Sequence, residues 1–449
     1  MELFLMSSAV LLSMMGLYMG RCVYLLPLRP KHFIHGICRA LKASNGDGIT
    51  PYEAFSAALG GCVGTGNIAG VAGAIAIGGP GAIFWLWISG ILGMATKYAE
   101  ALIAIRYRPG GGKDNAGGTM YCIVLGMGRG AWPLAAAFSV FALLASLACG
   151  NIVQSNTLAL AAASAAGALG FGEHIGLVKL MAGIITAALI YIVLRGGAKG
   201  ICSAAGKIVP VMSAVYIIAA AAVIYMFRAK LPEVLKMIMD GAFGLKSMAG
   251  GAAGFTMAQG IRVGMMRGIF SNEAGIGSAT MAYSSPKNGA DEAETAMLAA
   301  FDVFIDTIVI CTLTAFAVLC AADYIPYGYA EADGMAICLS AFSKLMGSGA
   351  AGVFLAVSSA LFAFSSMITW AMYGERALCF LSHDMGQGIY RICFAVICLI
   401  GSLSMPGIVW SMGEVFNALM ALPNIIMLIA LSGEIKRASK HYLAWRGRI

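Results

Sequence analysis

Two short polar motifs interrupt segments of the sequence that are otherwise apolar. The first, residues 64–67 (Gly-Thr-Gly-Asn), lies within 51–77, and the second, residues 270–275 (Phe-Ser-Asn-Glu-Ala-Gly), lies within 249–283. A backbone N–H or C=O group that leaves a helix at membrane depth must find another partner, because hydrocarbon offers none. Released N–H groups can bind a carboxylate, and released C=O groups can bind a cation. Each motif is therefore a candidate binding site.

At the first motif we expect a solute to contact Thr65, Gly66 and Asn67. The half-helix that begins near Asn67 presents free N–H groups and the positive end of its dipole, which suit a carboxylate. The carbonyls that end the preceding half-helix, such as those of Gly60 and Val63, can face a cation. Glycines four apart in this segment also suit close helix packing, which is the alternative interpretation. Packing alone requires neither Thr65 nor Asn67, so binding is favoured.

At the second motif, Asn272 and the backbone of Phe270 and Ser271 are candidates for contact with the same solute. Glu273 is a carboxylate in this apolar segment, and such groups usually face the interior of a helix bundle and have a partner. It can act as a coupling-ion or gating group. The favoured alternative is a structural anchor that bonds released backbone groups or an arginine such as Arg267.

Polar side chains in other apolar segments can complete a site. Gln154 can present its amide to the solute or form a hydrogen bond between helices, and the sequence leaves both open. Ser365 and Ser366 are adjacent hydroxyls that can complete an oxygen cage for Na⁺, a hard cation. In most membrane helices such hydroxyls only bond the preceding turn, which is the alternative. Trp370 either caps the pocket or packs in the core.

Four charged residues lie in apolar segments away from the two motifs. Lys97 and Glu100, about one turn apart, are predicted to pair at the cytoplasmic end of their segment. Asp302 and Asp306, four residues apart, can form a proton relay, although a structural bond to the segment that carries the second motif is favoured. The sequence contains no recognisable grouping of Ser, His and acid as in a hydrolase, and we do not expect an enzyme.

The composition is that of an integral membrane protein. The chain has 449 residues, of which 60% are hydrophobic and only 11% are charged, whereas about a quarter of the residues in a soluble domain are charged. The net charge of +8 does not indicate nucleic-acid binding, because its distribution follows the pattern of membrane loops. The 12 cysteines lie singly in apolar runs, so we expect buried thiols rather than a disulfide framework.

Windows of about 20 apolar residues, the length that crosses a bilayer, predict eleven transmembrane helices. The predicted spans are 2–20, 51–78, 80–105, 131–160, 175–194, 204–227, 249–283, 294–321, 349–374, 389–404 and 409–431. The first is expected to be a retained helix rather than a cleaved signal, because it ends in basic residues. The largest clusters of Lys and Arg follow this helix and end the chain, which predicts an outer N-terminus and a cytoplasmic C-terminus.

When the first helix is set aside, the two interrupted segments are the first and sixth of ten. This order predicts an all-α membrane fold of two inverted five-helix repeats, each beginning with a discontinuous helix. The expected parts are an N-terminal helix with a cytoplasmic basic loop (1–50), a first repeat (51–228), an outer amphipathic connection (229–248), a second repeat (249–432) and a cytoplasmic basic tail (433–449). Matching interruptions in two repeats indicate the binding site of a secondary transporter.

The sequence resembles the alanine or glycine:cation symporters, which are amino-acid transporters with the leucine-transporter-type fold. The resemblance is carried by motifs along nearly the whole chain, at residues 64–71, 78–85, 93–100, 267–278, 304–307, 362–366 and 417–424. It implies Na⁺-coupled uptake of small neutral amino acids, chiefly alanine and glycine, across a prokaryotic cell membrane by alternating access. It also implies that Na⁺ lies between the carbonyls of Gly60 and Val63 and the hydroxyls of Ser365 and Ser366.

The same resemblance implies a pose for the amino acid. Its carboxylate would meet residues 65–67, while residues 270–272 and Trp370 would close the pocket. One stretch departs from the family pattern: where the family usually has His-Pro-x-x-Gln-Gly, residues 285–294 read Ser-Pro-Lys-Asn-Gly-Ala-Asp-Glu-Ala-Glu. An acidic hinge therefore replaces a basic-polar one at the expected inner gate.

Two other functions are alternatives. The first is a proton-coupled amino-acid symporter, in which Glu273, Asp302 or Asp306 carries the proton. The second is an amino-acid sensor that does not transport, which is disfavoured because the predicted cytoplasmic tail is shorter than a signalling domain. The expected partners are a small neutral amino acid, Na⁺ and the lipid bilayer. We expect neither nucleic acid nor an obligatory protein partner.

Overall fold

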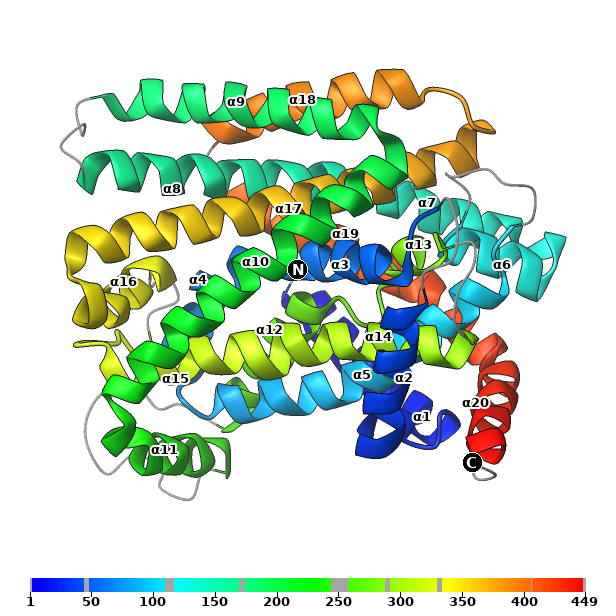
Figure 1. Cartoon of the computed structure of the whole chain (residues 1–449), viewed down its shortest axis with the longest axis horizontal. Helices are drawn as coiled ribbons and strands as arrows, with labels where there is room; N and C mark the ends of the chain where they lie inside the picture. Colours follow the sequence, from blue (N-terminus) through cyan, green and yellow to red (C-terminus); the bar gives the residue numbers. More distant parts are fainter. Residues whose placement is uncertain are drawn as a thin grey trace.

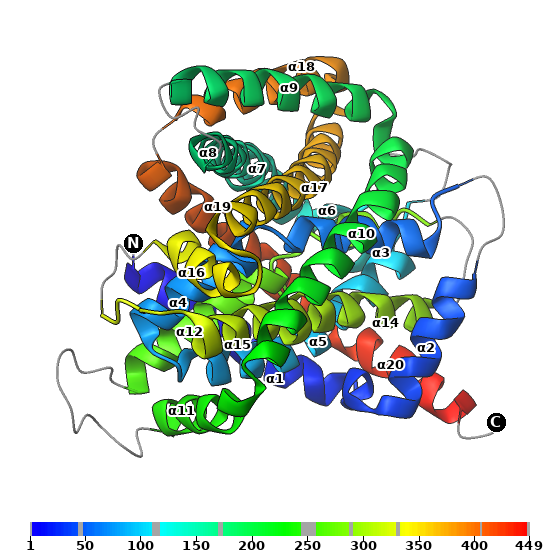
Figure 2. The same ribbon diagram turned by 60° about the vertical axis from the view of Figure 1, so that its left-hand side comes forward.

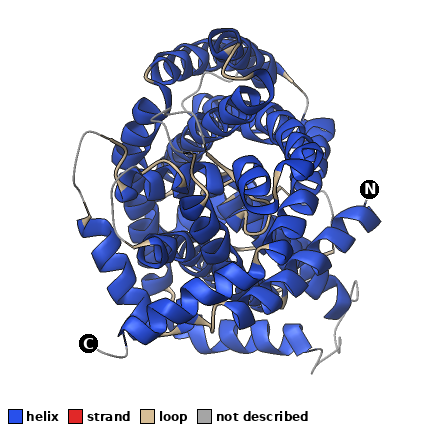
Figure 3. Cartoon of the chain, turned by 90° about the vertical axis from the view of Figure 1, so that its right-hand side faces the viewer, coloured by secondary structure: helices blue, strands red, loops and turns tan. Residues whose placement is uncertain are grey.

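The computed structural model describes residues 2–43, 48–109, 117–168, 174–243, 257–286, 291–328, 333–404 and 406–446. All regular elements within these ranges are helices, as Figure 3 shows. Most of them are built from long apolar runs, in which a helix satisfies every backbone N–H and C=O group within its own segment.

The helices are described in two groups, one before and one after residues 244–256, and the colours of Figure 1 follow their order along the chain. The first group is α1 (Glu2–Cys22), η1 (Leu26–Leu28), α2 (Pro30–Lys42), α3 (Pro51–Cys62), η2 (Thr65–Asn67), α4 (Ala69–Gly78), α5 (Ala82–Arg106), α6 (Thr119–Met127), η3 (Arg129–Ala131), α7 (Trp132–Leu147), η4 (Ala148–Val153), α8 (Gln154–Ala168), α9 (Ile175–Arg195), α10 (Gly197–Met226), η6 (Arg228–Lys230) and α11 (Leu231–Phe243). The second group is α12 (Met257–Asn272), α13 (Thr280–Tyr283), α14 (Glu292–Val303), η7 (Phe304–Cys311), α15 (Thr312–Ala321), α16 (Gly334–Met346), α17 (Ser348–Ser382), α18 (Gln387–Leu403), α19 (Pro406–Ala430) and α20 (Ser432–Arg446).

Both predicted interruptions are confirmed. Helix α3 ends at Cys62 and α4 begins at Ala69, with the single 3₁₀ turn η2 between them. Helix α12 ends at Asn272, and α13 begins only at Thr280. Glu273 directly follows α12 with a φ of 55°, outside the right-handed helical region, so the backbone cannot continue as a helix there.

Two long helices contain π turns where they pass the interruptions. The π turn η4 joins α7 to α8, and the π turn η7 joins α14 to α15. A π turn inserts an extra residue and redirects the side chains that follow it, and such turns are frequent at functional sites. Gly150 of η4 lies against the Trp370 side chain, and Asp306 of η7 accepts a hydrogen bond from Asn67.

The helices that follow the two interruptions pack against each other in pairs. Helix α5 packs on α14, α8 packs on α17, and α9 packs on α18. Figures 1 and 2 both show α9 and α18 side by side at one end of the molecule. The interrupted helices lie closer to the centre, where α3 contacts α10 and α17 and α12 contacts α4 and α5.

Six helices in the described part of the chain are long and apolar enough to cross a membrane, or seven if a bent pair counts as one span. The eleven predicted spans and their repeat arrangement therefore stay a prediction. The interrupted helices are not among these six, because each half is too short to cross a membrane alone: α3 has 12 residues and α4 has 10. The apolar windows missed α2, α6, α16 and α20, whereas α11 lies where the amphipathic connection was predicted.

Candidate functional site

A cavity of about 80 Å³ lies between the two interruptions. Its lining residues are Gly61, Cys62, Gly64, Thr65, Gly66, Cys149, Val153, Gln154, Arg267, Phe270, Ser271, Glu273, Ser366, Trp370 and Asn417. One buried water needs roughly 10–15 Å³, so the cavity accommodates roughly five to eight water-sized groups, which is the size of a small amino acid. Seven predicted site residues line it: Thr65, Gly66, Gln154, Phe270, Ser271, Ser366 and Trp370. Gly60, Val63, Asn67, Asn272 and Ser365 were also predicted but do not line it.

Asn67 holds the first interruption in place from behind the cavity wall. Its Oδ1 accepts a hydrogen bond from the Gly64 N–H at 2.9 Å, and its Nδ2 donates to Asp306 Oδ1 at 2.6 Å. The Asn67 side chain is completely buried. Its donor and acceptor groups therefore serve the protein itself, and they position the backbone of Thr65 and Gly66.

Asp306 also bonds the second interruption. Its Oδ2 accepts hydrogen bonds from Ser271 Oγ at 2.7 Å and from Thr307 Oγ1 at 2.8 Å. The predicted structural bond from Asp306 to the segment with the second motif is therefore confirmed. Because Asn67 and Ser271 belong to different interruptions, one buried carboxylate joins both.

Several buried polar atoms of the lining residues have no hydrogen-bond partner within the described structure. They are Thr65 Oγ1, Gln154 Oε1 and Asn417 Oδ1. A buried polar atom without a partner costs about 1–3 kcal/mol, so a group of them indicates where a ligand or ordered water binds. The first hydrogen bond of η2 joins the Asn67 N–H to Gly64 O at 3.2 Å. The N–H groups of Thr65 and Gly66 precede it and are donors of the kind that helix starts offer to anions.

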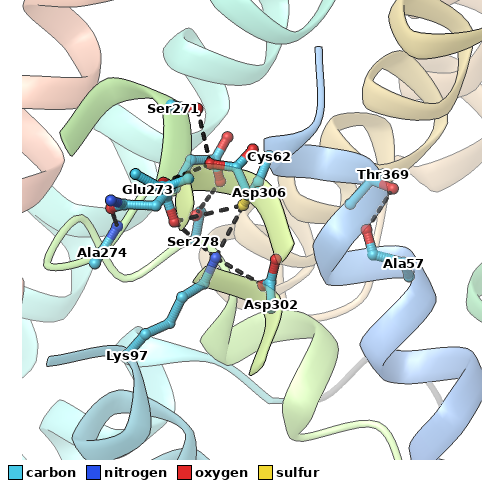
Figure 4. Close-up of polar contacts among 12 residues, drawn as sticks. Ala57, Cys62, Lys97, Ser271, Glu273, Ala274, Ser278, Asp302, Asp306 and Thr369 are labelled. Carbon is cyan, nitrogen blue, oxygen red and sulfur yellow. Dashed lines mark hydrogen bonds and ion pairs between the residues drawn. The ribbon is translucent and has the colours of Figure 1, made fainter. Parts of the chain in front are cut away.

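Glu273 is bonded to α17 and to its own loop. Its Oε1 accepts the Trp370 indole N–H at 3.0 Å, and its Oε2 accepts the Ser278 hydroxyl at 2.6 Å. Figure 4 shows Glu273 and Ser278 facing each other beside Lys97. These two bonds fit a structural anchor, but the predicted partners, backbone groups or Arg267, are wrong. Arg267 precedes Glu273 by more than one turn and lines the cavity instead.

Two hydroxyls of α17 face the carbonyls that end α3. Ser366 Oγ donates to Gly61 O at 2.9 Å. Ser365 Oγ donates to Phe362 O in the preceding turn of its own helix at 2.9 Å, as in the alternative interpretation, and lies 3.4 Å from Gly60 O. Carbonyls in the last turn of a helix have no intrahelical partner, and hard cations prefer carbonyl and hydroxyl oxygens. The oxygens of these four residues therefore fit a Na⁺ site. Val63 follows as the C-cap of α3, with φ −70° and ψ 101°.

Lys97 and Glu100 do not pair with each other, contrary to the prediction. Lys97 Nζ lies 2.7 Å from Asp302 Oδ2. Glu100 Oε1 accepts hydrogen bonds from Asn424 Nδ2 at 2.5 Å and from the Gly277 N–H at 3.1 Å. Helix α5 is buried along this part, so each charged side chain pairs with a residue of another helix or loop rather than with its neighbour one turn away.

The acidic stretch 285–294 lies partly outside the described residues, which omit 287–290. Two of its carboxylates meet basic residues of other helices. Glu292 pairs with Arg106 of α5 at 2.7 Å, and Glu294 pairs with Arg39 of α2 at 3.3 Å. The acidic residues that depart from the family pattern are thus paired with basic residues of α2 and α5.

Arg267, Asn417 and two cysteines, Cys62 and Cys149, line the cavity but were missed as site residues. Arg267 lies three residues before Phe270 on α12, so helical spacing could have placed both on one face. Asn417 and Cys149 come from α19 and η4. Asn417 begins one of the motifs that carry the family resemblance, which was the available signal, whereas the local sequence gives none for Cys149. The packing of α19 on η4 brings both to the cavity.

The sodium:alanine symporter family matches the chain over residues 2–448. The chain is 35% identical over 405 residues to the sodium/alanine symporter AgcS of Methanococcus maripaludis, which covers 89% of this chain and 85% of the relative. It is 36% identical over 438 residues to the probable sodium/glutamine symporter GlnT of Bacillus subtilis, which covers 96% of this chain and 87% of the relative. The family match extends over both interruptions and every residue that lines the cavity.

Solved structures of low sequence identity share the fold. MhsT in complex with L-phenylalanine superposes with a TM-score of 0.61 at 14% identity, over 86% of this chain and 90% of that chain. The manganese transporter of Eremococcus coleocola, with an aromatic bis-isothiourea compound, superposes with a TM-score of 0.56 at 14% identity, over 88% of this chain and 80% of that chain. The fold is thus of the leucine-transporter type. The chain belongs to the sodium:alanine symporter family, whose members are membrane transporters and not enzymes.

Proposed function

We propose that the protein is a Na⁺-coupled symporter of small neutral amino acids, chiefly alanine and glycine, that works by alternating access. The observation that carries this proposal is the small cavity between two interrupted helices, with unpaired polar atoms on its wall and the Ser366–Gly61 contact at its edge. A zwitterion of matching size supplies both the donors and the acceptors that such a wall requires.

In the proposed pose, the carboxylate of the amino acid accepts hydrogen bonds from the N–H groups of Thr65 and Gly66. Its ammonium group, which has three donors, faces Gln154 Oε1 and Asn417 Oδ1, both of which lack a partner in the described structure. Arg267 lines the same cavity and adds positive charge on the side of α12. The pose pairs the free amide oxygens of Gln154 and Asn417 with the ammonium group, and the unpaired Thr65 hydroxyl donates a further hydrogen bond to the carboxylate.

The size of the cavity supports alanine and glycine over longer amino acids. The relatives named above carry two different substrates in their names, alanine and glutamine. A volume of about 80 Å³ suits the roughly six non-hydrogen atoms of alanine better than the roughly ten of glutamine. The methyl group of alanine would lie against the apolar part of the wall, at Val153 and Phe270.

The position of the oxygen cage supports sodium coupling. Gly61 and Ser366 line the cavity, and the hydroxyls of Ser365 and Ser366 face α3 carbonyls. A cation held there draws α17 onto α3, while the substrate bridges η2 and α12. Both ligands therefore favour the same closed arrangement, and thermodynamic linkage requires each to raise the affinity for the other.

We place the N-terminus outside and the C-terminus in the cytoplasm of a prokaryotic cell, on the basis of the basic clusters after α1 and at the end of the chain. Uptake would then carry the amino acid and Na⁺ inward together, and the pairs of Glu292 with Arg106 and Glu294 with Arg39 would lie at the inner gate.

The experiment that tests this function is uptake of labelled alanine into proteoliposomes, with an inward Na⁺ gradient and then with K⁺ in place of Na⁺ at matched pH. Accumulation that requires Na⁺ supports the proposal. Accumulation that ignores Na⁺ but follows a proton gradient supports the alternative of proton coupling, for which Glu273 on the cavity wall is the candidate group. Binding without accumulation supports a sensor.

A further inference from the structure

The ammonium group of Lys97 lies where the first halves of both interrupted helices end. Lys97 is completely buried, and its Nζ lies 2.7 Å from the carbonyl oxygen of Asn272, 2.9 Å from Cys62 Sγ and 2.7 Å from Asp302 Oδ2. Cys62 is the last residue of α3, and Asn272 is the last residue of α12. Figure 4 shows Lys97 pointing into the space between Cys62 and Asp302.

The electrostatic potential around the Lys97 ammonium is negative and favours a cation. The C-terminal end of a helix carries about half a negative charge, and its last carbonyls have no intrahelical partner. Two such ends meet here, and Asp302 adds a full negative charge without any solvent exposure. Asp302 Oδ1 has no hydrogen-bond partner in the described structure, so the site offers an oxygen beyond those that Lys97 uses. Carbonyl and carboxylate oxygens in this arrangement would also suit a metal cation.

We propose that Lys97 is a tethered cation that occupies a second cation site, so that each amino acid is coupled to one Na⁺ only. This inference rests on the proposed function, because it concerns the stoichiometry of the same transport. The Na⁺ binds between α3 and α17, at Gly60 and Ser365. The Lys97 ammonium, supplied by α5, takes the charge position between α3 and α12 that a second mobile ion would otherwise fill.

The first test uses the wild-type protein and measures how much charge moves with each alanine. In proteoliposomes with a fixed Na⁺ gradient, the voltage of zero net alanine flux is recorded at two alanine gradients that differ tenfold. One charge per zwitterionic alanine shifts this voltage by about 59 mV, and two charges shift it by about 30 mV. The larger shift supports the inference and the smaller one overturns it. No Na⁺-driven flux at all would instead remove the proposed function.

The second test opens the site to an external ion. Lys97→Met keeps the carbonyls and Asp302 but removes the ammonium, so a second Na⁺ can bind. The Hill coefficient for Na⁺ in alanine binding should rise from about 1 to about 2. The double variant Lys97→Met with Asp302→Asn lacks the carboxylate as well and should return to about 1.

The control for the loss of a lysine is Lys207→Met, because Lys207 is an exposed residue of α10. An unchanged Hill coefficient in a Lys97→Met protein that still binds alanine would contradict the inference, since a merely structural ion pair leaves no cation site behind. If Lys97→Met does not fold, the charge measurement on the wild type decides the question alone.

Discussion

Asn67 donates a hydrogen bond to Asp306 at 2.6 Å, and this bond links the 3₁₀ turn of the first interruption to the π turn of α14–α15. Both side chains are completely buried. Asn67→Ala removes this donor and the acceptor for the Gly64 N–H, so two buried groups lose a partner. We expect a loss of about 1–3 kcal/mol of stability for each group left unpaired, and a lower melting temperature in detergent without substrate.

The conservative variant Asn67→Asp separates geometry from charge. It keeps an acceptor for the Gly64 N–H but places a second carboxylate against Asp306. A protein as stable as the wild type would show that the contact with Asp306 contributes little, whereas strong destabilisation of both variants supports the structural role.

The two interruptions themselves could be predicted from the sequence, because glycine and polar residues in an apolar run have few other uses at membrane depth. The sequence could not predict which residues of each motif face the cavity. Asn67 and Thr65 are both polar and only two residues apart, yet Asn67 turns toward Asp306 while Thr65 lines the cavity. That choice depends on η7, which contacts η2 only in the folded protein.

The partners of buried charged residues could not be predicted from the sequence either. Lys97 and Glu100 are neighbours on α5, and local spacing alone predicted their pairing. Their actual partners, Asp302 and Asn424, come from α14 and α19, far away in the sequence. Spacing within one helix describes exposed surfaces well, but a helix that is buried on several sides finds its partners across helix–helix contacts.

Thr65→Val should weaken alanine binding while leaving the fold intact. Its hydroxyl has no partner in the described structure and lines the cavity, and valine has nearly the same shape. A hydrogen bond contributes about 0.5–1.5 kcal/mol, so the dissociation constant for alanine should rise about two- to tenfold. Equilibrium binding of labelled alanine in saturating Na⁺ measures it.

The matched control for this variant is Thr157→Val on α8. Within the described residues the Thr157 hydroxyl bonds Val153 O of its own helix, at 2.9 Å, and Thr157 does not line the cavity. Equal effects of the two substitutions would remove Thr65 from the binding site.

The double variant Ser365→Ala with Ser366→Ala should raise the Na⁺ concentration that gives half-maximal uptake. It removes two of the oxygens that face the α3 carbonyls of Gly60 and Gly61. Alanine affinity in saturating Na⁺ should change much less, because linkage transmits the loss mainly through the bound fraction of Na⁺. Uptake measured over a range of Na⁺ concentrations at fixed ionic strength gives both values.

The control for the serine pair is Ser139→Ala, because Ser139 is buried in α7 and its hydroxyl donates to Ala135 O of its own helix, at 2.9 Å. Sodium dependence that stays at the wild-type value in the double variant would place the cation elsewhere.

Gly150→Ala should disrupt the site through Trp370. A Cβ atom added at Gly150 would lie only 2.2 Å from Trp370 Cβ and 2.5 Å from its Cγ, and both residues are buried. Either η4 must move, which shifts Gln154 at the start of α8, or Trp370 must move, which breaks its bond to Glu273. Overpacking of this kind costs about 1–3 kcal/mol.

The comparison that isolates this clash is Gly167→Ala on α8, where an added Cβ atom meets nothing within 4 Å. Replacing a helical glycine by alanine at such an open position should stabilise the protein by about 0.5–1 kcal/mol, because the unfolded chain loses conformational freedom. We therefore expect opposite signs: a lower melting temperature and weaker alanine binding for Gly150→Ala, and an equal or higher melting temperature with unchanged binding for Gly167→Ala. If Gly150→Ala binds alanine like the wild type, the close approach of Trp370 does not shape the cavity.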